Sequence, residues 1–159
     1  MKFKLLIAVL LLNGFDLQGE YVMNKRTGIW VETSHHREEY SVYNSSLMET
    51  NFLAGINHYK PFKNPINSKP HNGAYLGIYA KLRQGYYLGD KRPDYSAACL
   101  GLQGGIQSIS KQNIVFNMGL GFGAGCFIKK QDLMYLTLFE RYHLPLLDFR
   151  ANICLGYMF

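Results

Sequence analysis

The chain has 159 residues, a formal net charge of +6 and a hydrophobic content of 48%. This length suits one domain, and no stretch of about 18 apolar residues is present that could cross a bilayer as a helix, which excludes a helical membrane protein. The 12 Tyr, 10 Phe and 16 Gly, with only 5 Pro, favour strands and tight turns. We therefore expect a single all-β domain over residues 1–159.

Alternation of apolar and polar residues between turn signals predicts eight strands. In chain order they cover residues 3–12, 15–23, 28–34, 47–59, 73–87, 96–109, 113–127 and 145–159. Asn13-Gly14 and the segments 24–27 and 110–113 are short turns, whereas 35–46, 60–72, 89–95 and 129–144 are longer connections. Strands joined in this order form an antiparallel up-and-down meander, and eight of them can close into a barrel without free edges.

Three of these strands carry charged residues on one face and apolar residues on the other. The charged residues are Asp16 and Glu20, Lys81 and Arg83, and Asp148 and Arg150. A soluble barrel would turn these faces to water, and a membrane barrel would turn them inward, so alternation alone leaves both folds open. Because the faces carry both signs, opposing walls of a narrow interior could neutralise one another. We therefore predict an interior charge network.

The segment IVFNMGLGFGAGCFI has glycine at every second residue along one face. These glycines are Gly119, Gly121, Gly123 and Gly125, and they lie opposite Ile114, Phe116, Met118, Leu120 and Phe122. Such a face suits a barrel interior in which bulky side chains such as Tyr75, Tyr79 or Arg83 cross the lumen and need room. It would make a poor wall for an apolar ligand pocket, so it favours a membrane barrel.

The last sixteen residues, LPLLDFRANICLGYMF, alternate in the same way and end on an aromatic residue. The predicted lipid-facing side carries Phe149, Ile153, Leu155, Tyr157 and Phe159. A C-terminal strand of this kind resembles the signal by which bacterial outer-membrane proteins are recognised by their assembly machinery.

Most of the chain is similar to the small outer-membrane β-barrels of Bacteroidota. The similar stretches are residues 73–87, 100–125 and 144–159, together with a first hairpin pattern over 2–32. The resemblance implies an eight-stranded transmembrane barrel in the bacterial outer membrane, in contact with outer-membrane lipid and with the barrel assembly machinery through its last strand. It supplies no activity.

This topology places both termini and the short turns 24–27 and 110–113 in the periplasm, and the longer connections 35–46, 89–95 and 129–144 outside. Two connections do not fit the pattern. The external Asn13-Gly14 turn is very short, and the periplasmic segment 60–72, which contains three prolines, is long.

The opening MKFKLLIAVLLL also has the basic start and apolar core of a secretory signal peptide. Cleavage after Gly19 would remove one strand and leave seven, whereas bacterial single-chain barrels have even strand numbers. We therefore favour residues 3–12 as strand one, with an export signal lying upstream of this sequence.

Chemical sites are weakly indicated. The run SHHREE, from Ser34 to Glu39, could suggest a lipid-modifying enzyme, but Ser34 and His35 point in opposite directions in a strand, so we expect no catalysis. The cysteines Cys99, Cys126 and Cys154 lack CxxC spacing and His neighbours, so we expect no metal and no cofactor. The basic residues are scattered among loops, which disfavours nucleic acid and points to anionic lipid headgroups instead.

The main alternative is a soluble barrel that binds a small ligand. The tripeptide GIW at Gly28 to Trp30 looks like the first signature of lipocalins, and the segment 131–143 could be helical. The later lipocalin signatures are not evident, and the glycine face would leave a ligand pocket almost bare. We expect an outer-membrane barrel with a packed, non-catalytic interior, whose role is structural or lies in its external loops.

Overall fold

The computed structural model describes residues 3–8, 14–40, 45–62, 69–87, 95–130 and 146–159. All regular structure in these ranges is β-strand. The strands are β1 (Phe3–Ala8), β2 (Gly14–Val22), β3 (Thr27–Tyr40), β4 (Ser45–Pro61), β5 (Gly73–Tyr87), β6 (Tyr95–Ile109), β7 (Ile114–Lys130) and β8 (Leu146–Met158). The expectation of an all-β fold is confirmed.

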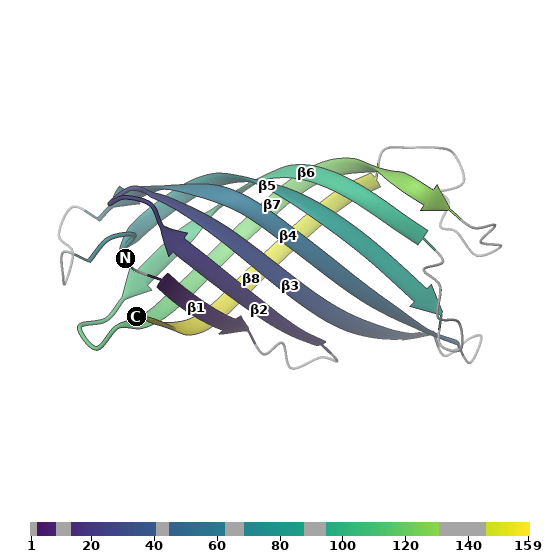
Figure 1. The fold of residues 1–159 in the computed structure, drawn as a ribbon, viewed down its shortest axis with the longest axis horizontal. Helices are drawn as coiled ribbons and strands as arrows, with labels where there is room; N and C mark the ends of the chain where they lie inside the picture. Colours follow the sequence, from purple (N-terminus) through teal and green to yellow (C-terminus); the bar gives the residue numbers. More distant parts are fainter. Residues whose placement is uncertain (1–2, 9–13, 41–44, 63–68, 88–94, 131–145) are drawn as a thin grey trace.

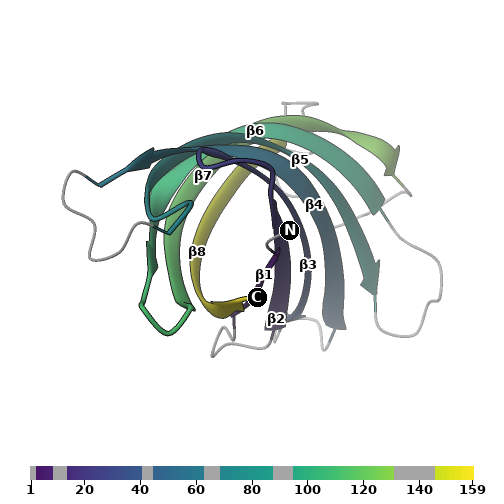
Figure 2. The same cartoon turned by 60° about the vertical axis from the view of Figure 1, so that its left-hand side comes forward.

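The strands form one sheet in which each strand pairs antiparallel with its neighbours in the chain, and this confirms the predicted up-and-down order. β1 also pairs with β8, where Leu5 lies opposite Tyr157, so the sheet closes on itself. Figure 1 shows the long strands running obliquely around the molecule, and Figure 2 shows the wall that they form around the interior. The beginning of β1 and the end of β8 lie at the same end of this wall, where Lys4 pairs with Met158, and we call it the termini end.

The strands β3 and β4 are longer than the sequence predicts. β3 continues to Tyr40, and the pairing with β4 is unbroken as far as Tyr40 opposite Ser45. The expected connection over 35–46 is therefore wrong for all but the four residues 41–44, which lie outside the described residues. The run SHHREE has no alternation of apolar and polar residues, so the sequence pattern did not predict a strand there. The hydrogen bonds of the ladder join backbones and require no apolar side chain.

Other sequence predictions fall partly or wholly outside the described residues. Strand 3–12 is described only as Phe3–Ala8, and the turn at Asn13 and the helical alternative over 131–143 are not described. β7 continues to Lys130, three residues beyond its predicted end. The remaining strands begin and end within two residues of their predicted bounds.

Side chains alternate strictly between the two faces of the wall, as the period of a strand requires. On β3, Trp30 is completely buried inside, whereas the neighbouring Val31 is 57% exposed on the outer surface. On β8, Asp148 is buried and Phe149 is 74% exposed. In the described parts of β2 to β8, the carboxylates thus point inward, and the large apolar side chains with the highest exposure point outward.

Candidate functional site

The interior of the barrel contains a series of paired charges, one between neighbouring strands and others between strands that are not neighbours. Farthest from the termini end, Glu49 on β4 accepts hydrogen bonds from Arg83 Nε on β5 at 2.6 Å and from Tyr95 OH on β6 at 2.7 Å. The guanidinium of Arg83 also forms an ion pair with Glu49 and lies 5.6 Å from the centre of the Tyr95 ring. One carboxylate therefore joins three strands.

A second pair occupies the next level of the interior. Asp148 on β8 accepts hydrogen bonds from Lys81 Nζ and Tyr79 OH, both on β5 and both at 2.7 Å. Lys81 and Asp148 lie on strands that are not neighbours in the sheet, so this ion pair spans the lumen. The Lys81 and Asp148 side chains are 12% and 5% exposed, and the charges are therefore largely removed from solvent.

A third pair joins β8 to β3. Arg150 Nη2 donates to Glu32 Oε2 at 2.5 Å, and the same guanidinium lies 4.9 Å from the centre of the Trp30 ring. A guanidinium over an aromatic face gains cation–π attraction, most strongly when desolvated. Trp30, the only tryptophan of the chain, thus packs against a charged side chain of the interior and does not line an apolar ligand pocket.

The fourth carboxylate, Glu20 on β2, lies completely buried near the termini end. Its two oxygens contact His71 Nδ1 at 2.8 Å and Tyr59 OH at 3.0 Å. His71 stacks on Tyr59 with ring centres 4.1 Å apart, and its Nε2 lies 2.9 Å from the backbone carbonyl oxygen of Asn24. Both ring nitrogens lie within hydrogen-bond distance of oxygen atoms, so the imidazole is held at both of its polar positions.

His71 belongs to the long connection between β4 and β5, whose described residues 69–72 fold into the termini end of the barrel. Gln107 Nε2 donates to the His71 carbonyl at 2.9 Å, and the amide of Ile109 donates to Asn72 Oδ1 at 3.4 Å. Lys69 Nζ donates to the backbone carbonyls of Ser110 and Lys111 in the turn between β6 and β7. We call residues 69–72 the plug segment. The contacts of the plug segment inside the barrel give a physical reason for the length of the connection between β4 and β5.

Amide side chains fill the space between the plug segment and the charged levels. Gln103 donates to Asn57 at 2.7 Å, Tyr75 OH donates to Asn117 at 3.0 Å, and Asn117 donates to Gln107 at 3.3 Å. All four amide side chains are buried. Because amides supply both donors and acceptors, they can complete a buried network without further charge.

The interior glycines make room for the side chains that cross the lumen. A Cβ atom at Gly119 would meet the Tyr75 hydroxyl, and one at Gly123 would meet the Tyr79 hydroxyl at 2.9 Å. Gly121 faces the aliphatic part of Arg150, and Gly125 faces Cys99. Tyr75 and Tyr79 thus lie where the sequence predicts, whereas the Arg83 side chain binds Glu49.

Gly28 has a similar role in the GIW tripeptide. A Cβ at this position would meet Glu20 Oε1 and, at 2.8 Å, His71 Cε1. The glycine and the tryptophan of this tripeptide therefore serve the interior network, the first by leaving space and the second by packing against Arg150.

Of the six predicted network residues, the structure places five inside the barrel with partners. Glu20 bonds His71, Lys81 bonds Asp148, Arg83 bonds Glu49, and Arg150 bonds Glu32. The sixth, Asp16, lies in β2, and its side chain is outside the described set. Sequence reasoning missed Glu32 and Glu49, although each shares a strand face with other inward polar residues. It also missed His71, for which a long proline-containing connection was the only signal.

The outer surface of the described strands is apolar and aromatic. Its most exposed large side chains are Leu76, Ile78, Leu100, Leu102, Leu120, Ile128, Phe149, Ile153, Leu155 and Phe159. Phe122 and Phe149 pack at 5.0 Å between ring centres, and Tyr157 and Phe159 at 5.1 Å. The predicted lipid-facing residues Phe149, Ile153, Leu155, Tyr157 and Phe159 all lie on this surface with 45 to 74% exposure.

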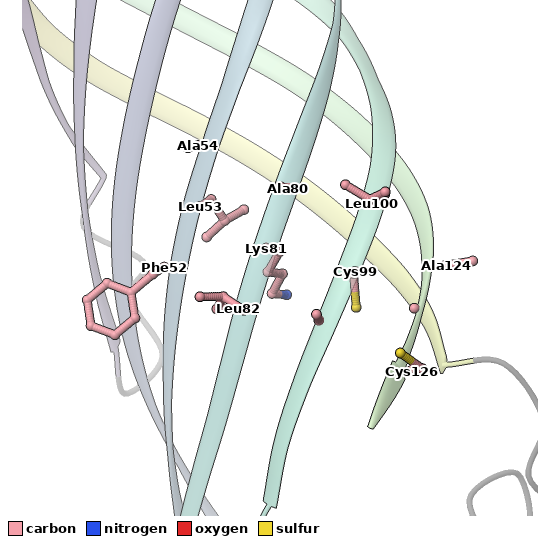
Figure 3. Close-up of a pocket in the computed structure, with 12 residues that line it drawn as sticks. Phe52, Leu53, Ala54, Ala80, Lys81, Leu82, Cys99, Leu100, Ala124 and Cys126 are labelled. Carbon is pink, nitrogen blue, oxygen red and sulfur yellow. The ribbon is translucent and has the colours of Figure 1, made fainter. Parts of the chain in front are cut away.

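A shallow depression crosses this surface over strands β4 to β7 (Figure 3). Its volume is about 490 Å³, and its outward floor is formed by the small residues Ala54, Ala80, Ala98 and Ala124, with the exposed Cys126 at one edge. Phe52, Leu82 and Leu100 stand beside these residues. The depression is thus a consequence of small side chains among large ones, and it contains no outward charge.

In the SHHREE run, His36 shares the inward face of Ser34 and His35 points outward, and the side chains of residues 37–39 lie outside the described set. Ser34 is buried inside, whereas His35 Nδ1 lies 3.0 Å from Thr50 Oγ1 on the opposite face of the wall. Cys99 and Cys154 are buried thiols in separate strands. Among the described residues, no three His, Cys, Asp or Glu side chains gather as metal ligands.

No helix in the described ranges has the length and apolar character needed to cross a membrane. Comparison with protein-family models, with curated protein sequences and with solved structures finds no significant match.

Proposed function

We propose that this chain is an eight-stranded transmembrane β-barrel of the bacterial outer membrane, with a packed and non-catalytic interior. The observation that carries the proposal is the distribution of polarity. Glu32, Glu49 and Asp148 pair with Arg or Lys inside the barrel, Glu20 contacts His71 there, and large apolar side chains are exposed around the outside. Soluble monomers rarely expose continuous apolar patches larger than a few hundred Å², whereas an apolar outer band is what lipid requires.

The interior geometry supports a barrel that does not conduct solutes. Arg150, Trp30 and Tyr79 lie against one another across the lumen, and Tyr79 also bonds Asp148. The plug segment fills the termini end. Barrels of about eight strands enclose an interior that side chains can fill.

Two other functions are less well supported by these contacts. A soluble ligand-binding barrel needs an apolar interior, whereas the described interior holds three ion pairs of Lys or Arg with carboxylates, the Glu20–His71 contact and a network of amides. A lipid-modifying enzyme would need its serine and histidine on one face, which excludes His35 as a partner of Ser34 and leaves His36, the other histidine of this run.

By elimination, the role of the barrel would be structural support of the outer membrane or binding through its external connections. The resemblance in the C-terminal strand also supports recognition by the barrel assembly machinery, because its outward aromatic and aliphatic residues remain accessible on the barrel wall.

The experiment is a comparison of heated and unheated samples on a denaturing gel, combined with fractionation of cells that express the chain with an export signal. We expect the protein in the outer-membrane fraction, with a mobility that changes on heating because a closed barrel resists detergent. A protein that stays soluble without detergent and shows no heat-dependent mobility would refute the proposal and favour a soluble barrel.

A further inference from the structure

The outer surface at the termini end carries basic side chains, and none of the acidic side chains that the structure describes lies on the outer surface to balance them. Lys25, Arg26, His58, Lys60 and Lys111 are all exposed there. The acids whose side chains are described, Glu20, Glu32, Glu49 and Asp148, all point into the barrel and bond interior partners. Within the described part of the chain, the outer rim at this end therefore presents positive charge alone.

Three of these basic residues line one groove on the outer surface. His58 and Lys60 are outward residues of β4, and their partners across the ladder on β5 are Leu76 and Ala74. Arg26 lies in the turn before β3, and its carbonyl accepts a hydrogen bond from the Tyr59 amide at 2.6 Å, which holds this turn against β4. The groove has a volume of about 490 Å³ and is also lined by Pro61 and Leu76.

The two walls of the groove differ in chemistry. The side formed by β4 and the turn before β3 carries the guanidinium, imidazole and ammonium of Arg26, His58 and Lys60, none of which has a side-chain ion-pair partner among the described residues. The other side carries Leu76, which is 74% exposed and continues into the apolar outer surface through Ile78. Ala74, opposite Lys60, is small and leaves the groove open between them.

We propose that this groove binds an anionic glycerophospholipid, with the phosphate held by Arg26 and Lys60 and an acyl chain lying along Leu76. A guanidinium can bind two phosphate oxygens at once, and an ammonium adds a second point of charge. A free phosphate would use only the basic wall, whereas a lipid uses both walls, so the continuity with the apolar surface selects the lipid. Basic pockets at the edge of a membrane-spanning surface bind such headgroups. This inference rests on the proposed membrane location.

The test measures how strongly the refolded barrel retains phosphatidylglycerol relative to phosphatidylcholine, by native mass spectrometry from mixed micelles. The groove variant is R26Q/K60Q. The control variant is K25Q/K111Q, which removes the same charge from exposed positions outside the groove. We expect wild type and control to prefer phosphatidylglycerol, and the groove variant to retain it about 30-fold less strongly.

Three results would overturn the inference. Wild-type protein that binds both lipids equally would show that the groove has no preference for an anion. Equal losses in the two variants would assign the preference to general surface charge. Displacement of phosphatidylglycerol by inorganic phosphate alone would assign the groove to a free anion. The heat-dependent mobility of each variant is measured in parallel, so that absence of a barrel, which would refute the proposed function, is distinguished from loss of lipid selectivity.

Discussion

Gly119 offers a sharp test of the packed interior, because its inward face touches a side chain from another strand. A Cβ atom at this position would meet the Tyr75 hydroxyl oxygen and, at 2.7 Å, Asn152 Oδ1. Both contacts are closer than a carbon atom allows, so Gly119→Ala must displace them. The matched control is Gly104→Ala in β6, whose Cβ would meet mainly the flexible end of Leu76 on the outer surface.

The expected magnitudes follow from these contacts. Overpacking a filled interior costs about 1–3 kcal/mol, and replacing glycine by alanine returns about 0.4–1 kcal/mol by restricting the unfolded chain. We therefore expect Gly119→Ala to lower the free energy of unfolding by about 1–2 kcal/mol and Gly104→Ala to leave it unchanged or slightly raised.

Tyr75→Phe supplies the second arm of a double-mutant cycle. It removes the hydroxyl that the new methyl group would meet, and it also removes the hydrogen bond to Asn117, at a cost of about 0.5–1.5 kcal/mol. In the double variant the methyl group gains the space of the hydroxyl but still meets Asn152 Oδ1, so we expect Gly119→Ala to cost less, and not nothing, when Tyr75 is already phenylalanine. Unfolding is followed in urea through the heat-dependent mobility of detergent-refolded protein.

Two outcomes would contradict this reasoning. Additive effects of Gly119→Ala and Tyr75→Phe would mean that the hydroxyl does not occupy the space over the glycine. Equal destabilisation by Gly104→Ala would mean that alanine is unfavourable in the strands themselves, and the glycine face would then have no connection with side chains that cross the lumen.

Two further predictions test the interior charges and the outer surface. Arg150→Gln leaves Glu32 buried without its cation, so we expect the free energy of unfolding in urea to fall by about 3–5 kcal/mol. The exposed Lys111→Gln is the control and should lower it by less than about 0.5 kcal/mol. A similarly small loss for Arg150→Gln would mean that this ion pair is exposed to solvent. Leu120→Lys on the outer surface should cost about 2–4 kcal/mol for the barrel folded into lipid vesicles, whereas Ser108→Lys, nearer the termini end, should cost under about 1 kcal/mol. Equal, small effects of the two lysines would be incompatible with a lipid-covered surface at Leu120.

The strand order was predictable because period-2 alternation is strong wherever one face is apolar. In β5 and β8 the apolar residues mark both the strand and its outward face, so these strands end within two residues of their predicted bounds. The end of β3 was not predictable in this way. The segment from His35 to Tyr40 is polar on both faces, and it forms a strand because its backbone pairs with β4. The alternation of residues within one segment carries no information about such pairing.

The partners of the interior charges were only partly predictable for the same reason. The sequence identifies an inward face, and it therefore places Lys81 and Asp148 in the interior. It does not give the height of one strand relative to another across the lumen, which decides that Asp148 meets Lys81 whereas Arg83 meets Glu49. His71 belongs to no strand, so no periodicity could indicate that it would bond Glu20.

The plug segment explains why the connection at the termini end is longer than a tight turn. A short turn between β4 and β5 would leave the buried Glu20 carboxylate without its contact to His71 Nδ1 at 2.8 Å. His71 makes this contact with a positive φ of 64°, a conformation that costs a non-glycine residue free energy. The hydrogen bonds from Gln107 to the His71 carbonyl and from Ile109 to Asn72 offset this cost. The plug segment therefore occupies the interior at the termini end, where His71 stacks on Tyr59 and contacts the buried Glu20.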